Sequence, residues 1–262
     1  MDTENQYGCL SMQKYLLPIM DDIDRVCRKH NIQYTLSDGS LLGAVRHEGF
    51  IPWDDDIDVS LDRTNLNKLL NVFETELGDQ YMIVYDIWVP RISRKDNPRK
   101  NEFPPEGCID LWIFDKVPLS KIKEKIQVFL LVMLQGMLKP KAINNSLSTL
   151  DKLKVSGTFL LGKLFSTHRK QKWYETISQW GNHDQSDRLA RFNDAFFGVK
   201  KWRFSTSILD GYHEVSFEGR KYMALVGWEE MLTTEYGDYM KIPDDKDKRT
   251  THEHTKTSLY NL

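Results

Sequence analysis

Three aspartates at alternate positions constrain the fold of this chain more than any other feature. Asp54, Asp56 and Asp58 are separated by single residues. Side chains alternate between the two faces of a β-strand, so a strand here would point all three carboxylates the same way. The opposite face would carry apolar side chains, those of Ile57, Val59 and Leu61. Carboxylates gathered on one face repel one another unless a cation neutralises them. The segment therefore predicts a divalent metal site built on a strand.

Two other interpretations of the acidic segment are weaker. A solvated acidic loop would not need the apolar residues that alternate with the aspartates. A helix-loop-helix calcium site requires glycine at the sixth loop position and glutamate at the twelfth. Counted from Asp54, these positions hold Val59 and Asn65. We therefore expect a site for magnesium or manganese rather than a calcium loop of this type.

A further carboxylate is expected from a neighbouring strand. Asp110 lies within the apolar segment Ile109–Ile113, and an ionised group in such a strand is rare without a partner. An edge-strand carboxylate with no role in the site is the alternative. We predict that Asp56, Asp58 and Asp110 bind Mg²⁺ or Mn²⁺, with two ions held across a substrate phosphate. Asp54 is expected to be a further ligand or a base that orients an acceptor hydroxyl.

A Gly-Ser turn upstream of the acids predicts a phosphate contact. Gly39 and Ser40 precede a predicted helix, and their backbone N–H groups and hydroxyl could bind donor phosphates. Arg46, His47 and Arg91 are candidates for the same phosphates. Arg46 and His47 could equally be surface residues at the end of a helix, where cations are favourable. Arg91 could equally belong to a solvated loop.

The remaining pattern predicts an α/β protein of one domain, with a mixed sheet flanked by helices. Helices are expected over residues 16–30, 41–46, 65–77 and 228–236, and strands over 33–36, 56–61, 81–92 (with a break at Pro90) and 108–114. A hairpin over 215–223 should turn at Glu218–Gly219, and Gly237 should end the last helix. We expect one domain over 1–262, with a core over about 15–118 and 205–245 and a helical insert over about 119–200.

Bulk properties exclude some classes of protein. The net charge of -2 argues against a nucleic-acid binder that relies on a basic surface. The cysteines, Cys9, Cys27 and Cys108, have no metal-ligand spacing and fit a reducing compartment. The first residues lack the pattern of a signal peptide, so we expect a cytoplasmic protein. The apolar stretch 126–138 is shorter than a membrane span. A buried helix is expected there, and a helix on the membrane surface is the alternative, because lysines flank it.

The segment from Leu36 to Arg63 resembles the LicD family, whose members include relatives of the fukutins. The resemblance rests on the Gly39-Ser40 turn, on the run from Leu41 to His47, on Gly49-Phe50-Ile51-Pro52-Trp53 and on Asp54-Asp55-Asp56-Ile57-Asp58. Weaker similarity covers residues 107–115, 214–221 and 235–240, and His252 or His254 resembles the family's C-terminal histidine. The resemblance implies a nucleotidyltransferase-like fold.

The resemblance also implies an activity, the metal-dependent transfer of a phospho-substituent from a CDP-activated donor to a sugar hydroxyl. The family's best-known case moves phosphocholine from CDP-choline and releases CMP. Its acceptors are surface glycans such as lipopolysaccharide, teichoic acid or capsule. Trp112 and Lys116 depart from the family's pattern, which leaves phosphoglycerol, ribitol phosphate and phosphoethanolamine open as the transferred group.

Two alternatives belong to other classes. A nucleotide-sugar-dependent glycosyltransferase also uses an Asp-x-Asp pair to hold its metal, although it would not need the Gly39-Ser40 turn. An inactive glycan-binding protein of the same fold should have lost one of the acids, whereas Asp56, Asp58 and Asp110 are all present. The sequence therefore favours the transferase.

Overall fold

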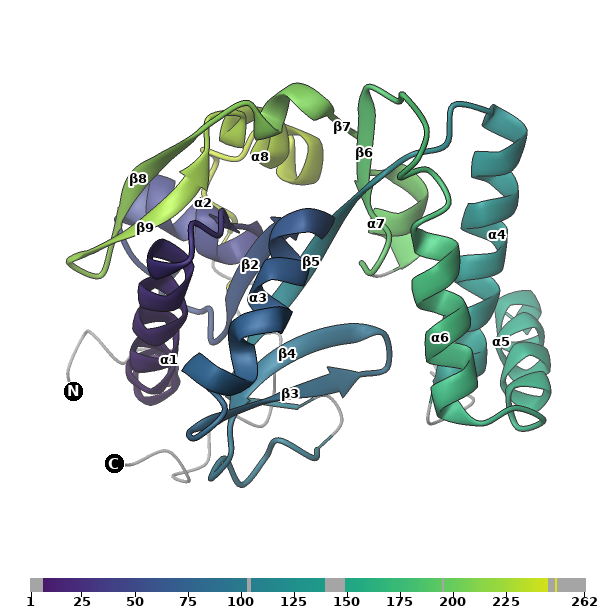
Figure 1. Cartoon of the computed structure of the whole chain (residues 1–262), viewed down its shortest axis with the longest axis horizontal. Helices are drawn as coiled ribbons and strands as arrows, with labels where there is room; N and C mark the ends of the chain where they lie inside the picture. The colour runs from purple at the N-terminus through teal and green to yellow at the C-terminus, as the bar shows by residue number, and fades with distance from the viewer. Residues whose placement is uncertain (1–6, 103–104, 140–148, 195, 245–247, 249–262) are drawn as a thin grey trace. The chain divides into compact units, whose positions relative to one another are not determined.

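The computed structural model describes residues 7–102, 105–139, 149–194, 196–244 and 248 (Figure 1). The chain divides into two compact units. The first unit comprises residues 1–86, 90–113 and 207–262, and the second comprises 87–89 and 114–206. The predicted insert over about 119–200 falls within the second unit. His252 and His254 lie outside the described residues.

The first unit is built on a sheet whose strands follow the order β1, β2, β5, β4, β3. Their bounds are Thr35–Leu36 for β1, Ile57–Asp62 for β2, Cys108–Lys116 for β5, Val89–Arg94 for β4 and Tyr81–Asp86 for β3. The apolar face predicted for the acid-bearing strand is confirmed, since Ile57, Val59 and Leu61 are each at most 1% exposed. β2 and β5 lie side by side, so polar residues on their other face can meet.

Helices cover this sheet. They are α1 (Leu10–Lys29), α2 (Asp38–His47), α3 (Arg63–Glu76) and α8 (Trp228–Tyr236). α1 buries Leu16, Met20 and Ile23 at helical spacing, as the sequence pattern predicts. Asp62 caps α3, because its carboxylate accepts a hydrogen bond from the backbone N–H of Asn65 at 2.8 Å. The acid-bearing strand therefore passes directly into a helix.

The C-terminal part of the first unit contains a separate hairpin of β8 (Tyr212–Phe217) and β9 (Arg220–Leu225). It turns at Glu218 and Gly219, whose φ angles of 49° and 72° lie in the left-handed region and favour glycine. α8 ends at Gly237, which has a φ of 67°. The sequence predicted both the turn and the helix end.

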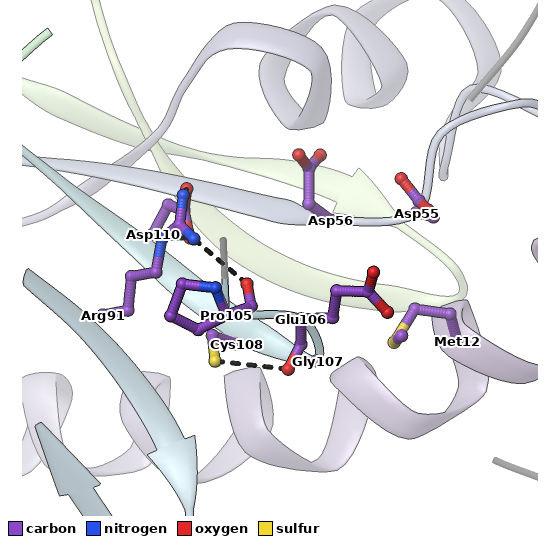
Figure 2. Close-up of a pocket in the computed structure, with 9 residues that line it drawn as sticks. All are labelled: Met12, Asp55, Asp56, Arg91, Pro105, Glu106, Gly107, Cys108 and Asp110. Atoms are coloured by element: carbon purple, nitrogen blue, oxygen red, sulfur yellow. Dashed lines mark hydrogen bonds and ion pairs between the residues drawn. The ribbon is translucent and has the colours of Figure 1, made fainter. Parts of the chain in front are cut away.

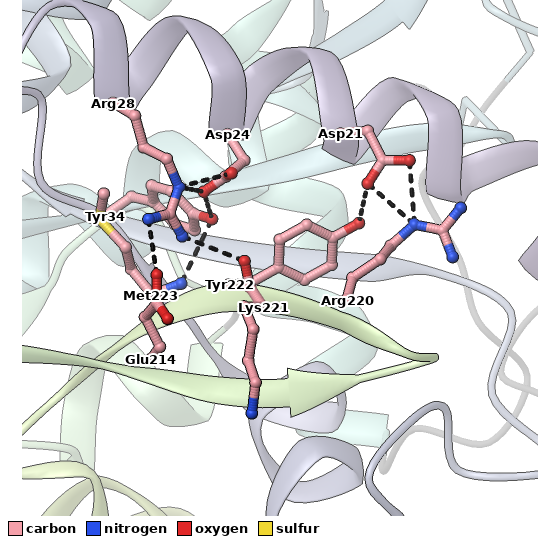
Figure 3. Close-up of polar contacts among 9 residues, drawn as sticks. All are labelled: Asp21, Asp24, Arg28, Tyr34, Glu214, Arg220, Lys221, Tyr222 and Met223. Carbon is pink, nitrogen blue, oxygen red and sulfur yellow. Dashed lines mark hydrogen bonds and ion pairs between the residues drawn. The ribbon is translucent and has the colours of Figure 1, made fainter.

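The hairpin and α1 are joined by a network of polar contacts (Figure 3). Asp24 accepts hydrogen bonds from Arg28 at 2.7 Å and from the Tyr34 hydroxyl at 2.6 Å. Towards the tip of the hairpin, Asp21 accepts from Tyr222 at 2.7 Å and from Arg220 at 2.9 Å. Each of these carboxylates therefore has a cationic partner.

The second unit is mainly helical. It contains α4 (Lys121–Leu138), α5 (Thr149–Gly162), α6 (Thr167–Ser178), α7 (Phe196–Lys201), β6 (Arg188–Arg191) and β7 (Phe204–Ser205). A short 3-10 turn, Thr206–Leu209, leads back to the first unit. The core of the second unit gathers Leu131, Leu134, Tyr174 and Phe192. Among the described helices, none combines the length and the apolar character needed to cross a membrane.

The α/β fold class predicted from the sequence is confirmed. Two local predictions were wrong. The helix expected to begin at Leu41 begins at Asp38, so Gly39 and Ser40 form its first turn and not a separate loop. The break expected at Pro90 lies earlier, because Ile87 adopts a left-handed φ of 58° and Pro90 already belongs to β4.

Candidate active site

The acidic segment gathers its carboxylates in the first unit, though not in the predicted alternation. Asp54, Asp55 and Asp56 each offer a carboxylate oxygen, and these oxygens lie within 4.8 Å of one another. β2 begins only at Ile57, so the alternation of a strand does not apply to the residues before it. The same alternation predicts that Asp55 points away from Asp54 and Asp56, and this prediction was wrong. Carboxylate oxygens are the ligands that Mg²⁺ and Mn²⁺ prefer, and this group could hold such an ion.

Asp58 lies within β2 and is 6% exposed. The indole N–H of Trp112, on the neighbouring strand β5, donates a hydrogen bond to its carboxylate at 2.8 Å. Burial raises the pKa of Asp58 well above its ordinary value, because removal from water disfavours the charged form. Nearby carboxylates raise it further, those of Asp56, Asp38 and Asp110.

Asp54 is subject to the same crowding. Burial, followed by the charge of Asp58, raises the pKa of Asp54 to about 7. A carboxyl group with such a pKa can hold or release a proton near neutrality. The negative charges of these acids therefore repel one another. Binding of a proton or a cation would relieve this repulsion.

The first turn of α2 is built around these acids. A Cβ atom on Gly39 would collide with the Asp54 carboxylate, so glycine is needed for the close approach. The Ser40 hydroxyl accepts a hydrogen bond from the backbone N–H of Asp58 at 2.9 Å, and the Ser37 N–H donates to the Asp58 carbonyl at 3.0 Å. Ser40 thus fixes the backbone of the acidic strand. The predicted contact of the Ser40 hydroxyl with a donor phosphate stays a prediction.

Arg91 and Asp110, which were predicted to have separate roles, contact each other (Figure 2). They are opposite residues of β4 and β5. The Arg91 guanidinium meets the Asp110 carboxylate through two N–O distances of 2.8 Å and donates to the Pro105 carbonyl at 3.0 Å. Both side chains are buried. Asp110 therefore already has a cationic partner. Arg91 could contact a donor phosphate only while it stays next to the Asp110 carboxylate.

A small pocket runs from this ion pair to the acidic segment (Figure 2). Asp55 and Asp56 line one side, and Glu106 faces them in the view of Figure 2. Glu106 is itself paired with Arg99. The pocket is lined in full by Met12, Asp55, Asp56, Arg91, Pro105, Glu106, Gly107, Cys108 and Asp110. Asp110 and Asp56 thus line one pocket, whereas Asp58 is not among its lining residues and is hydrogen-bonded to Trp112.

Arg46 and His47 lie at the opposite end of α2 from Gly39. Arg46 follows Gly39 by seven positions, or about 10 Å along the helix axis. The Arg46 guanidinium donates to His47 at 3.0 Å and to the Tyr239 carbonyl at 3.2 Å. Burial lowers the pKa of His47, and the neighbouring Arg46 charge lowers it further. These residues are therefore removed from the Gly39 end, where we expected donor phosphates.

Sequence reasoning missed Tyr236 and Asp38. Tyr236 is 45% exposed as a whole residue. Partial removal of its phenol from water raises the pKa of the hydroxyl, and the charges of Asp38, Asp58 and Asp54 are among the further causes. The hydroxyl therefore lies near the acids, although Tyr236 comes from α8. The weak similarity over residues 235–240 was the available signal. Asp38, the first residue of α2, has a left-handed φ of 47°, which no local sequence pattern announced.

Comparison with known proteins supports the interpretation of this site. The model of the LicD/FKTN/FKRP nucleotidyltransferase domain matches residues 31–122, which include α2, the acidic segment and β5. The lipopolysaccharide cholinephosphotransferase LicD of Haemophilus influenzae is 28% identical over 267 residues, which cover 95% of each chain. An uncharacterized protein of Rickettsia prowazekii is 35% identical over 104 residues, 38% of this chain and 34% of that protein. Residues 31–122 therefore match the nucleotidyltransferase domain of the LicD family, and the similarity to LicD extends over nearly the whole chain.

Proposed function

We propose that this protein is a phosphotransferase that moves phosphocholine from CDP-choline to a sugar hydroxyl of a lipopolysaccharide and releases CMP. The observation that carries the proposal is the gathering of Asp54, Asp55, Asp56 and Asp58 beside the first turn of α2. The resemblance to a cholinephosphotransferase over 95% of both chains supports the choice of donor and acceptor. Teichoic acid and capsule offer the same kind of hydroxyl.

We assign the cation, Mg²⁺ or Mn²⁺, to the carboxylates of Asp55 and Asp56, whose oxygens lie within 4.8 Å of each other and of an Asp54 oxygen. Asp58 adds its charge from the adjacent strand position, and a second ion would lie towards Asp110, the remaining predicted ligand. When bound, such ions neutralise the charge of the phosphates that react. Because Arg91 already pairs with Asp110, we expect the site near Asp56 to bind more tightly.

The residues of the chain supply positioning and a proton acceptor. The first turn of α2 points its backbone N–H groups at donor phosphates. Asp54, with a pKa of about 7, accepts the proton of the sugar hydroxyl as the sugar oxygen bonds to the phosphorus of the phosphocholine group. The bond from that phosphorus to the CMP oxygen breaks, and CMP leaves with the electron pair. One P–O bond forms and one breaks.

The test is a donor panel with the purified full chain. CDP-choline, CDP-ethanolamine, CDP-glycerol, CDP-ribitol, a UDP-sugar and a GDP-sugar are each incubated with lipopolysaccharide, with and without Mg²⁺. Release of CMP and the phosphorus NMR spectrum of the glycan report transfer. We expect magnesium-dependent transfer from CDP-choline. Transfer of a sugar from UDP or GDP would instead establish the glycosyltransferase, and binding without turnover would establish the inactive protein.

We also propose that the second unit contacts the cytoplasmic face of a membrane, because a lipopolysaccharide acceptor is lipid-anchored. Ile122, Ile126 and Phe129 of α4 are 73%, 49% and 62% exposed, and their spacing places them on one face of the helix. Lys121 and Lys125 are exposed beside them. Exposed apolar side chains next to lysines suit an anionic bilayer.

Vesicle sedimentation tests this contact. We expect the chain to sediment with phosphatidylglycerol vesicles, and Phe129→Glu to weaken sedimentation several-fold. Val226→Glu, at an exposed apolar position of the first unit, serves as the matched control. Sedimentation that is the same for Phe129→Glu and the control would refute the contact, as would self-association through this face in analytical ultracentrifugation.

A further inference from the structure

Trp53, which directly precedes the acids, carries a cation on its ring. The ammonium nitrogen of Lys248 lies 5.5 Å from the centre of the Trp53 ring. Tyr7 packs edge-on against the same tryptophan, with ring centres 5.6 Å apart and an angle of 67° between the planes. The Trp53 side chain is partly exposed. An ammonium group within about 6 Å of a tryptophan ring is attracted by the negative face of the ring.

The position of Trp53 is fixed relative to Asp54. The backbone N–H of Asp54 donates to the Ile51 carbonyl at 2.9 Å, which closes a turn that contains Trp53. The Gln13 side chain, from α1, donates to the Asp54 carbonyl at 2.8 Å. Consecutive Cα atoms are about 3.8 Å apart. The backbone that carries the Trp53 ring is therefore held next in the chain to the carboxylates assigned to cation and phosphate binding.

Phosphocholine carries a cation and an anion a short distance apart. A phosphate and a trimethylammonium group are joined by a two-carbon link, and the ammonium cannot donate a hydrogen bond. Aromatic rings recognise such quaternary ammonium groups through their negative faces. We propose that Trp53, with Tyr7 at its edge, binds the trimethylammonium group of the donor while its phosphates lie at the acids. This inference rests on the proposed function for the identity of the donor.

Lys248 then has a defined role. Its ammonium group takes the place of the donor's quaternary ammonium on the Trp53 ring while the donor is absent, and donor binding displaces it. The two cations compete for one face of the ring. Removal of Lys248 should therefore strengthen the binding of a quaternary ammonium ion, whereas removal of Trp53 should weaken it.

The experiment uses tetramethylammonium chloride and the full chain, with sodium chloride at equal ionic strength as the reference. The indole N–H resonance of Trp53, assigned by its loss in Trp53→Phe, is followed by NMR during the titration. We expect tetramethylammonium to shift this resonance and Lys248→Ala to tighten binding by about twofold to fivefold. Binding to the Trp53 variants is then followed through the methyl resonance of tetramethylammonium itself, by saturation-transfer NMR. Trp53→Phe should weaken it modestly and Trp53→Leu by about fivefold to thirtyfold.

Matched controls separate recognition from packing. Lys200 lies over Phe196 at 4.4 Å in the second unit, and Trp173 is exposed there. Lys200→Ala and Trp173→Leu should leave tetramethylammonium binding unchanged. A Trp53 resonance that stays still in both wild type and Lys248→Ala would overturn the site, and so would equal binding by Trp53→Leu and Trp173→Leu.

Release of CMP from CDP-choline is measured on the same samples. Tetramethylammonium binding at Trp53 without CMP release would refute the proposed function and leave the ammonium site standing. CMP release with no response at Trp53 would refute the ammonium site alone. Where both hold, Trp53→Leu should raise the KM for CDP-choline and leave the inhibition constant of CMP unchanged.

Discussion

Two acidic regions of the first unit differ in how their charges are balanced. Between α1 and the hairpin, Asp21 is paired with Arg220 and Asp24 with Arg28, and tyrosine hydroxyls donate to both carboxylates (Figure 3). In the acidic segment, carboxylates face other carboxylates. The first arrangement joins a helix to a hairpin. The second raises the pKa of its members and opposes folding unless a cation or a proton is bound.

The difference separates a structural role from a functional one. Paired surface charges stabilise a fold modestly, and nothing further is needed to explain them. The acidic segment and β2 bring like charges together, which destabilises the fold. Such a cluster indicates a bound ligand that neutralises these charges. The comparison predicts that substitutions in the two regions have opposite effects on stability and activity.

The largest effect is expected from Asp58→Asn. Asparagine keeps the acceptor for the Trp112 indole but removes a buried charge from the cluster. We expect turnover to fall on the order of a thousandfold, while the melting temperature of the metal-free protein rises because repulsion is relieved. Asp21→Asn in the hairpin network is the matched control and should keep full activity. Asp58→Asn enzyme that retains half its activity at saturating Mg²⁺ would refute the assignment, and the same holds for Asp56→Asn.

Gly39→Ala should have the next largest effect. The added methyl group would collide with the Asp54 carboxylate and displace it, which we expect to lower kcat/KM by about a hundredfold. Gly157→Ala is the control, because a Cβ atom on Gly157 meets nothing within 4 Å. That control should be neutral or slightly stabilising. If Gly39→Ala and Gly157→Ala have equal activity, the close approach of α2 to Asp54 has no catalytic importance.

Metal-free protein should lose stability as the pH rises from about 4 to 7. The pKa of Asp54 is about 7 in the folded chain and near 3.8 in the unfolded chain. The folded state thus binds more protons in this range, so the free energy of unfolding decreases with pH. Thermal unfolding at several pH values measures the slope, which Asp54→Asn should reduce. A stability that increases with pH over this range, and does not respond to Asp54→Asn, would contradict the crowding of the acids.

The sequence predicted those features that local chemistry decides. Gly219 and Gly237 mark the hairpin turn and the end of α8 because a left-handed backbone favours glycine. The alternation of Ile57, Val59 and Leu61 identified the buried face of β2. The pairing of Arg91 with Asp110 could not be predicted, since it depends on the register between β4 and β5.

The same limit applies within the site. The alternation of Asp54, Asp56 and Asp58 suggested one shared face, but β2 begins only at Ile57 and Asp55 joins the cluster. Tyr236, whose pKa responds to the charges of these acids, comes from α8, far along the chain. Such contacts depend on tertiary packing, which the residue pattern does not contain.

The smallest effect is expected in the paired region. Tyr222→Phe removes the hydroxyl that donates to Asp21 at 2.7 Å. Because Arg220 still neutralises that carboxylate, we expect a loss of about 1 kcal/mol in the free energy of unfolding and no change in kcat/KM. Urea denaturation and the CMP-release assay measure both quantities. A tenfold loss of activity in Tyr222→Phe would show that the hairpin network takes part in the site.

The most direct test of the contrast between the two regions is Mn²⁺ binding, followed by electron paramagnetic resonance of the free ion. We predict that the wild-type chain binds Mn²⁺ in the presence of CDP-choline, that Asp56→Asn and Asp58→Asn lose this binding, and that Asp21→Asn and Asp24→Asn keep it. Equal Mn²⁺ binding by all four variants, or none by the wild type, would contradict the proposal that the acidic segment is the metal site of a phosphotransferase.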